Sequence, residues 1–260
     1  MTPSDAEFFA KNGFAVTVSL DGIGHVHDQQ RPFANGRGTF ARIIERIAPL
    51  FEVKPALNVA ARVTVTPKNL SIKETVDGLI GLGFASVGVS PVLRSSKPVE
   101  MSPSDLEVML EGMKACGNAF REKLAVGEAY PFSNLVTALQ QIHRGVVQHY
   151  PCGAGNNYFG VSADGDIAAC HRFVDDEVGH LGTVETGFTH KLAAWKTERH
   201  VLAQSACHSC WARFLCGGGC HHEVVERGRP ACDYIRGWLS YCLETYVWVM
   251  ESHPHFLKSC

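Results

Sequence analysis

The sequence lacks any run of about 18 apolar residues, and this absence excludes a membrane-spanning helix. It also lacks a surplus of either charge, because it contains 24 lysines and arginines and 26 aspartates and glutamates. A protein that binds the nucleic-acid backbone needs a basic surplus or stripe, so we expect no nucleic-acid partner. The start of the chain is polar and acidic, unlike a secretory signal, and we therefore expect a cytoplasmic protein with no membrane contact.

Cysteine is absent from residues 1–115 and is concentrated in the rest of the chain. Cys116 stands alone, and the remaining cysteines of the ten fall between Cys152 and Cys260. In a reducing compartment, cysteines at this density are more often metal ligands than disulfides. The uneven distribution indicates two regions that are stabilised in different ways.

The first region alternates between strand and helix patterns. Strands are expected at 14–20, 58–66 and 85–92, and helices at 39–51 and 71–82. Strands separated by helices of this length indicate a parallel sheet with right-handed crossovers, whose functional groups lie at the carboxyl ends of the strands. Because three strands alone leave an exposed edge, we expect the sequence to start inside a larger barrel.

Further helices and one hairpin are expected after the third strand. The helices are expected at 102–124, 133–148 and 233–251. Residues 158–169 form two short strand-like segments around Asp164-Gly165, a dipeptide typical of tight hairpin turns. A hairpin brings its two ends together, so Cys152 and Cys170, which flank it, can reach one site.

Four cysteines follow the compact pattern C-x2-C-x5-C-x3-C, with one more downstream: Cys207, Cys210, Cys216 and Cys220, then Cys232. Three consecutive glycines, 217–219, fill the last gap. Glycine permits the positive φ angles and the close approach of amides to sulfur that a tight metal-binding loop needs. From spacing alone, zinc and iron–sulfur ligation remain equally open, and disulfides are less favoured. Seven cysteines fit two clusters that share a loop better than they fit one zinc site.

The seven cysteines together resemble the signature of the SPASM domain, the auxiliary iron–sulfur module of radical S-adenosylmethionine enzymes that modify peptides. The spacings, the turn glycine Gly165 and the Cys-Gly-Gly-Gly-Cys loop agree with it together. The first region also resembles this family, whose fourth strand, following loop and next strand are similar to residues 18–22, His27-Asp28, Arg31, 36–40 and 62–66. The resemblance covers nearly the whole chain.

This resemblance implies an α/β fold, with strands four to six of a partial (β/α)6 TIM-like barrel over residues 1–125 and a Cys-rich SPASM domain over residues 126–260. The SPASM domain would hold two auxiliary iron–sulfur clusters, expected to be of the 4Fe-4S type. The ligands would be Cys207, Cys210, Cys216 and Cys232 for one cluster, and Cys152, Cys170 and Cys220 for the other. The second set is one thiolate short, so water, a substrate thiolate or a residue such as His149 would complete it.

The same resemblance implies S-adenosylmethionine as a cofactor of the intact enzyme. Ser19 and Arg31 match family residues that contact its ribose and carboxylate, and a hydroxyl at a strand end and a guanidinium suit these roles. Alternatively, Ser19 caps a turn and Arg31 is a surface charge. The general base is left open among four residues, Asp164, Asp166, His171 and Asp175.

The C-x3-C-x2-C triplet that binds the catalytic cluster in this family is missing, because Glu223 stands where a third cysteine would follow Cys216 and Cys220. We therefore expect the chain to represent the C-terminal two-thirds of such an enzyme and to be inactive alone. Three cysteines are expected to be spare thiols, namely Cys116, Cys242 and Cys260. Solvated surface charges are expected at Arg94 and Lys97, and the neighbours His221 and His222 should point in different directions from one helix.

The implied function is that of a peptide- or protein-modifying maturase that receives electrons from a donor such as flavodoxin or ferredoxin. Residues 207–223 and 232–238 look most like maturation proteins of quinohemoprotein amine dehydrogenase, which form thioether cross-links. Sulfatase-maturing enzymes, which produce formylglycine, are the alternative within the family. Outside the family, the alternatives are a non-catalytic peptide-binding module stabilised by iron–sulfur or zinc, and a zinc protein with an unrelated α/β domain.

Overall fold

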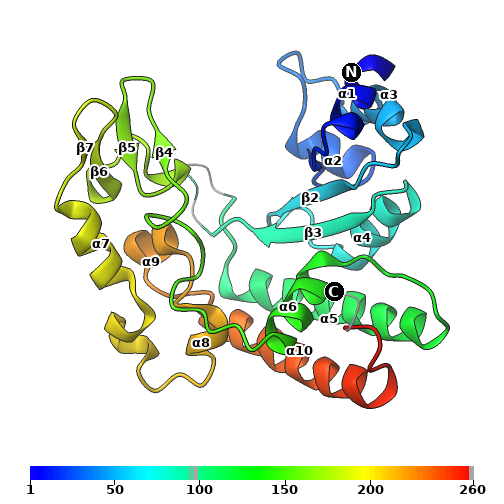
Figure 1. Cartoon of the computed structure of the whole chain (residues 1–260). Coiled ribbons are helices and arrows are strands. Elements are labelled where there is room, and N and C mark those ends of the chain that lie inside the picture. Colours follow the sequence, from blue (N-terminus) through cyan, green and yellow to red (C-terminus); the bar gives the residue numbers. More distant parts are fainter. Residues whose placement is uncertain (94, 96–98, 258–260) are drawn as a thin grey trace. The chain divides into compact units, whose positions relative to one another are not determined.

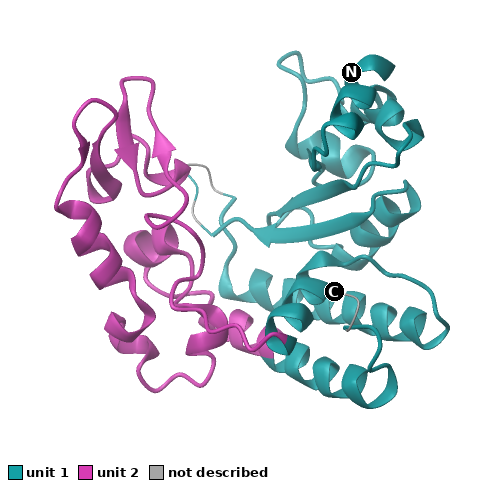
Figure 2. Cartoon of the chain, in the orientation of Figure 1, with its two compact units in different colours: residues 1–143, 240–260 teal, residues 144–239 magenta. Residues whose placement is uncertain are grey.

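The computed structural model describes residues 1–93, 95 and 99–257, so Arg94, Lys97 and Cys260 lie outside the described residues. The chain separates into two compact units, residues 1–143 with 240–260 (unit 1) and residues 144–239 (unit 2) (Figure 2). These units differ in extent from the division expected after residue 125. Helix α6 (Ser133–His143) packs on the sheet of unit 1, and the last part of α10 (Cys232–Ser252) also belongs to that unit.

Unit 1 is built on a three-stranded parallel sheet with the strand order β1-β2-β3 (Figure 1). The strands are β1 (Val16–Ser19), β2 (Val59–Val65) and β3 (Ser86–Pro91). The helices before α6 are α1 (Pro3–Lys11), α2 (His25–Gln30), α3 (Phe40–Glu52), α4 (Ile72–Gly81) and α5 (Pro103–Ala125). The expected strands and helices of this region are confirmed, with ends shifted by a residue or two. The helix expected over 133–148 ends earlier, at His143, because Gly145 takes a left-handed conformation with φ of 62°.

The two faces of the parallel sheet differ in character. Along β2, every second side chain from Val59 to Val65 is buried, and the side chains between them are exposed or half-buried. Residues that pair in register point to the same side of a sheet. Ser19 pairs with Arg62, Arg62 pairs with Gly88, and Thr64 pairs with Ser90. We call the side of the sheet that carries these residues the polar face.

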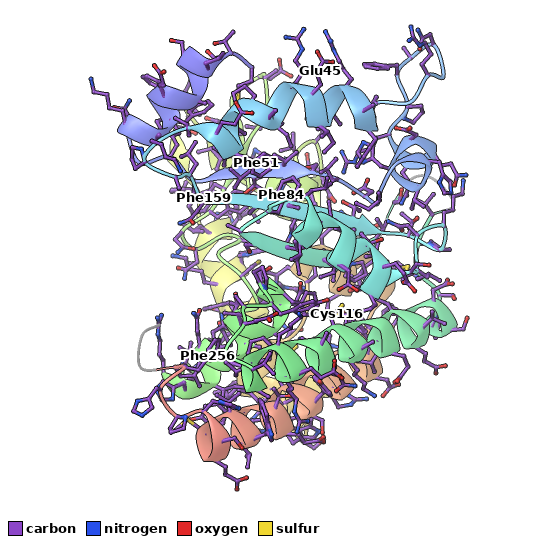
Figure 3. All side chains as sticks on the ribbon, turned by 90° about the vertical axis from the view of Figure 1, so that its right-hand side faces the viewer. Glu45, Phe51, Phe84, Cys116, Phe159 and Phe256 are labelled. Carbon is purple, nitrogen blue, oxygen red and sulfur yellow. The ribbon has the colours of Figure 1, made fainter. Side chains whose placement is uncertain are left out.

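Apolar side chains from the helices cover the other face and form the core of unit 1. Phe51 of α3 lies edge-on to Phe84, with 5.2 Å between the ring centroids, and Figure 3 shows the two side chains together. Helix α5 contributes Phe120, which packs against Phe256 at 5.3 Å. This packing holds the polar face on a rigid support.

Unit 2 contains a small antiparallel sheet with the strand order β4-β5-β6-β7. Its strands are β4 (Gly160–Val161), β5 (Asp166–Ala168), β6 (His180–Thr183) and β7 (Gly187–Phe188), and its helices are α7 (Lys191–Arg199), α8 (Arg213–Cys216) and α9 (His221–Arg227). Short 3-10 turns η1 (His171–Phe173), η2 (Glu177–Gly179), η3 (Val201–Ala203) and η4 (Ser205–Cys207) connect them. The expected hairpin is confirmed, with Gly165 at φ of 88° in its turn. Across the described part of the chain, no helix is long and apolar enough to cross a membrane.

Candidate metal centres

Four cysteines in unit 2 line a single cavity. They come from four places in the chain, since Cys207 ends η4, Cys210 follows it, Cys216 ends α8 and Cys232 begins α10. These are the residues that the sequence predicts as the ligands of one cluster. The fold therefore gathers this set from a span of 26 residues, and we call the four thiols the first centre.

The glycine loop after Cys216 supports the first centre. Gly217, Gly218 and Gly219 have φ angles of 71°, 101° and 80°, which side chains rarely adopt. A Cβ atom on Gly217 would lie 2.6 Å from the Pro151 nitrogen, so the loop needs glycine there for space as well as for conformation. The conformation turns the N–H groups of Gly218 and Gly219 toward the Cys216 sulfur.

Arg229 ties this loop to the segment that carries Cys207. Its Nη1 donates to the Gly218 oxygen at 2.6 Å, and its Nη2 donates to Gln204 Oε1 at 2.7 Å. Gln204 lies directly before η4, which ends at Cys207. The guanidinium thus fixes the two halves of the cavity wall and places a positive charge beside the thiols.

Burial and nearby donors have opposite effects on the pKa of two thiols of the first centre, Cys207 and Cys216. Burial raises the pKa of Cys216, against the effect of hydrogen bonds from Gly218 and Gly219. Burial also raises the pKa of Cys207, and the positive charge of Arg229 opposes this effect. In both cases neighbouring cysteines raise the pKa further. Metal binding requires the thiolate, and this form is favoured at Cys216 by the two N–H donors and at Cys207 by Arg229.

Three other cysteines, Cys152, Cys170 and Cys220, form what we call the second centre. Burial raises the pKa of Cys170, and the charges of Cys220 and Cys152 raise it further, so the three lie within electrostatic range of one another. The N–H groups of Arg172 and Phe173 donate to the Cys170 sulfur. Beyond Cys152, Gly155 N donates to the Ala169 oxygen at 2.8 Å, which holds that segment against the end of the hairpin.

The four thiols of the first centre suit more than one kind of metal group. Among the described residues, no group of three or more His, Cys, Asp or Glu side chains is placed to hold a metal ion. Thiolates are ligands of zinc ions and of iron–sulfur clusters alike. The preference for a cluster rests on the resemblance of the seven cysteines to the SPASM signature.

His149, the candidate for the fourth ligand of the second centre, packs among aromatic rings of unit 2. Its ring stacks on His200, with 5.0 Å between centroids, and lies edge-on to Phe214 at 6.2 Å. Its role as a ligand stays a prediction.

The four candidate bases occupy different surroundings. His171 follows Cys170 and accepts or donates a hydrogen bond of 2.7 Å between its Nδ1 and the Tyr158 hydroxyl. Asp166 lies 3.3 Å from His180 Nε2. Asp175 has a φ of 64°, and Asp164 is exposed in the hairpin turn. Of the four, His171 is the one beside a predicted cluster ligand.

Ser19 ends β1, and Arg31, which directly follows α2, reaches the end of β2 with its side chain. Arg31 Nε is 2.5 Å from Asp21 Oδ2, and its Nη2 is 3.5 Å from Thr64 Oγ1. Asp21 is buried, and its Oδ1 also accepts a hydrogen bond of 2.8 Å from the Thr64 N–H. Arg31 is therefore not an isolated surface charge, because it is tied to the end of β2.

Sequence reasoning missed several contacts that shape this end of the sheet. Asp28 Oδ1 accepts from the N–H groups of Thr39 and Phe40, both at 2.7 Å, and so caps the start of α3. Gly38 lies so close to the Asp28 carboxylate that a Cβ atom there would overlap it. The presence of both His27-Asp28 and Gly36–Phe40 in the sequence is the pattern from which the Asp28 contacts could be predicted. No neighbouring residue in the sequence indicates the position of Arg62 on the polar face.

Two of the spare cysteines and the histidine pair of α9 lie wholly or partly in the interior. Cys116 in α5 (Figure 3) is buried, which raises the pKa of its thiol to about 12, and Cys242 in α10 is fully buried. His221 packs against Trp195 at 5.6 Å, whereas His222 packs against Phe173 at 5.0 Å. Burial lowers the pKa of His221 to about 4. The two neighbouring histidines thus contact different aromatic rings.

No family model matches the sequence. A cysteine-type anaerobic sulfatase-maturating enzyme of Clostridium novyi is 27% identical over 232 residues, which cover 84% of this chain and 60% of that enzyme. An uncharacterized protein of Archaeoglobus fulgidus is 26% identical over 250 residues, which cover 89% of this chain and 58% of that protein. The chain thus spans less than two thirds of the length of these curated relatives.

Solved structures of anSMEcpe are similar over nearly the whole chain. Native anSMEcpe with bound AdoMet has a TM-score of 0.75 and 20% identity, covering 96% of this chain and 72% of that chain. Native anSMEcpe with bound AdoMet and a Kp18Cys peptide has a TM-score of 0.75 and 19% identity, covering 96% and 73%. The chain therefore has the α/β fold of these structures. Together with the sequence similarity, this supports the resemblance to radical S-adenosylmethionine enzymes with a SPASM domain, without singling out the quinohemoprotein amine dehydrogenase maturation proteins.

Proposed function

We propose that this chain serves a radical S-adenosylmethionine maturase, an enzyme that modifies a peptide or protein, and that it binds two auxiliary iron–sulfur clusters. The observation that carries the proposal is the single cavity lined by Cys207, Cys210, Cys216 and Cys232. Similarity to a sulfatase-maturating enzyme supports the choice of reaction class. The chain spans 60% of that relative, so the activity belongs to the proposal rather than to the comparison.

In this proposal, the first centre holds one cluster through its four thiolates, and the second centre holds the other through Cys152, Cys170 and Cys220. The clusters, when bound, supply electron transfer or a site for a substrate thiol. The chain's own contribution is positioning. The glycine loop aims N–H groups at Cys216, and the hairpin holds Cys152 and Cys170 near Cys220. An electron donor such as flavodoxin or ferredoxin would deliver the electrons.

Ser19 and Arg31 are proposed for S-adenosylmethionine. Ser19 lies at the carboxyl end of β1 on the polar face, where a hydroxyl can meet a sugar oxygen. Arg31 keeps a side chain that is 43% exposed, although its Nε is engaged with Asp21. The buried carboxylate fixes the direction of the guanidinium and leaves its outer edge for a carboxylate.

Two reactions on the peptide are candidates, and each rests on a different observation. Formylglycine formation is favoured by the similarity to a cysteine-type sulfatase-maturating enzyme. Thioether formation is favoured by the resemblance of residues 207–223 and 232–238 to quinohemoprotein amine dehydrogenase maturation proteins. Mass spectrometry of a cysteine-containing peptide treated with the intact enzyme distinguishes them. A thioether product loses only hydrogen and keeps its sulfur, whereas formylglycine made from cysteine has lost the sulfur.

The experiment that tests the proposal is the metal content of the chain after anaerobic expression and purification. Iron, zinc and acid-labile sulfide are measured per chain. Two four-iron clusters predict about eight iron and about eight sulfide with little zinc. Stoichiometric zinc without sulfide would contradict the proposal and leave a zinc-stabilised peptide-binding module as the function.

A further inference from the structure

Arg62 occupies the middle of the polar face in unit 1. It lies on β2, the central strand, and pairs in register with Ser19 on one side and with Gly88 on the other. The residues before and after it, Ala61 and Val63, are buried, whereas Arg62 is exposed. The strand therefore presents this guanidinium on the same face as Ser19, the residue proposed to contact S-adenosylmethionine.

The side chain of Arg62 is directed across the neighbouring strand. Its Nη2 donates to the Ser90 hydroxyl at 2.9 Å. A Cβ atom on Gly88 would lie 2.7 Å from Arg62 Nη1, so the guanidinium rests where residue 88 has no side chain. One hydroxyl contact and one missing side chain thus fix a long side chain that would otherwise move freely in solvent.

The guanidinium has no counter-charge of its own. In the part of the chain that the structure describes, no carboxylate lies within ion-pair distance of Arg62, whereas Arg31 pairs with Asp21 and Arg42 pairs with Glu45. Ser90 is neutral and engages only one of the five N–H donors. The guanidinium has two forks, Nε with Nη2 and Nη1 with Nη2, and each fork uses a different N–H of Nη2. Because Ser90 takes only one of these N–H groups, one fork stays open, and such a planar fork matches the two oxygens of a carboxylate.

We propose that Arg62 binds a carboxylate on the polar face, with Ser90 orienting the guanidinium. Two sources of carboxylate fit the proposed function, namely an acidic side chain of the peptide substrate and the amino-acid end of S-adenosylmethionine. Only the choice of these two sources rests on the proposed function. The carboxylate site itself rests on the unpaired guanidinium and its place on the sheet.

The test uses two matched pairs of probes on the whole chain. The first pair is a peptide with blocked termini and an uncharged BODIPY label, Ala-Cys-Ala-Ala-Glu-Ala-Ala, and its twin with Gln in place of Glu. The second pair is S-adenosylmethionine and its decarboxylated form. Binding of each probe is measured by anisotropy or by equilibrium dialysis. We expect one carboxylate probe to bind about tenfold more tightly than the twin that lacks this carboxylate, as a charge-assisted fork should.

Three variants locate this preference. Arg62→Gln should abolish it by weakening the binding of the carboxylate probe, and Arg62→Lys, which keeps the charge but loses the fork, should restore it only in part. Arg42→Gln removes an arginine that already has a carboxylate partner, and it should leave the preference unchanged. The pair that shows the preference identifies the source of the carboxylate.

Equal binding of the twins in both pairs would overturn the carboxylate site, and so would a preference that survives in Arg62→Gln. Iron and sulfide are measured on the same samples, so this failure is separable from failure of the proposed function. If the chain binds iron and sulfide but shows no carboxylate preference, the proposed function stands and the carboxylate site is wrong. If it shows the preference but binds no iron and sulfide, the carboxylate site stands and the proposed function is wrong.

Discussion

Arg31 and the buried carboxylate of Asp21 form an ion pair with 2.5 Å between Nε and Oδ2. The second oxygen of Asp21 accepts from the Thr64 N–H at 2.8 Å, so the pair joins the loop after β1 to the end of β2. Asn69 reinforces the junction, because its Nδ2 donates to the main-chain oxygens of Asp21 and Thr64. A residue proposed for cofactor binding is therefore also part of the framework that aligns two strands.

The first prediction is that Arg31→Met lowers the free energy of unfolding by about 1–3 kcal/mol, because the buried Asp21 carboxylate loses its counter-charge. Adding Asp21→Asn should recover part of this loss, since the uncompensated charge is then gone. Urea denaturation of the two single variants and the double variant gives the coupling energy of the pair. An Arg31→Met protein as stable as the parent would show that Arg31 has no structural role.

The second prediction concerns the pH dependence of stability through His27. Its Nδ1 accepts from the Asp21 N–H at 3.1 Å, and its Nε2 lies 3.1 Å from Thr39 Oγ1. Burial lowers the pKa of His27 below 6.5, because the ring is surrounded by protein and is neutral when it accepts that N–H. As pH falls through 6.5, the unfolded chain takes up a proton that the folded chain resists, so stability decreases until the lowered folded pKa is reached.

His27→Asn isolates this effect, because an asparagine oxygen can accept from the Asp21 N–H without titrating. Between pH 7.5 and pH 5.5, the parent should lose up to about 1.4 kcal/mol more stability than the variant, the free energy of one pH unit below the ordinary pKa. Denaturant titrations at the two pH values supply the comparison. Identical losses in parent and variant would mean that His27 binds its proton as readily folded as unfolded.

The repeating elements of unit 1 are predictable because periodicity is a local property. The alternation from Val59 to Val65 identifies β2, and the Ser102-Pro103 start identifies α5, where Ser102 and Asp105 form a capping box. The pairings across the polar face are not local. Arg62 and Ser90 are 28 residues apart, and nothing near either residue in the sequence marks the other as its partner.

In the candidate centres, too, features set by neighbouring residues are predictable, whereas contacts between distant segments are not. The Asp164-Gly165 dipeptide predicts a hairpin, and the hairpin accounts for the approach of Cys152 to Cys170. The link from Arg229 to Gly218 and Gln204 depends on where two irregular segments meet, and β7 and α8 are too short to show any period. The cysteines of the first centre could therefore be predicted from the sequence. Arg229, which links the two segments of the cavity wall, could not.

The third prediction is that Gly217→Ala prevents assembly of the first centre. The new Cβ would meet the Tyr150 and Pro151 backbone, which cannot move as a side-chain end can, and the φ of 71° adds strain. Gly127→Ala is the control, because its φ is 76° and the space around it is open. We expect Gly217→Ala to lose about half of the iron and Gly127→Ala to keep it, at a cost near 1 kcal/mol in stability. Full iron in Gly217→Ala would show that the loop is not part of a centre.

The fourth prediction assigns the ligands by replacing single cysteines and measuring iron and sulfide per chain. Cys232→Ala and Cys170→Ala should each lose about four of about eight iron atoms, since they remove ligands of different centres. Cys242→Ala should keep all the iron, because Cys242 is fully buried in α10 and burial raises the pKa of its thiol, which disfavours the thiolate that a metal needs. Cys116→Ala should also keep it, because that thiol is held in the interior beside Tyr130. Loss of iron in Cys242→Ala with full iron in Cys232→Ala would exchange the roles of these two residues, and equal iron in all four variants would leave no centre to assign.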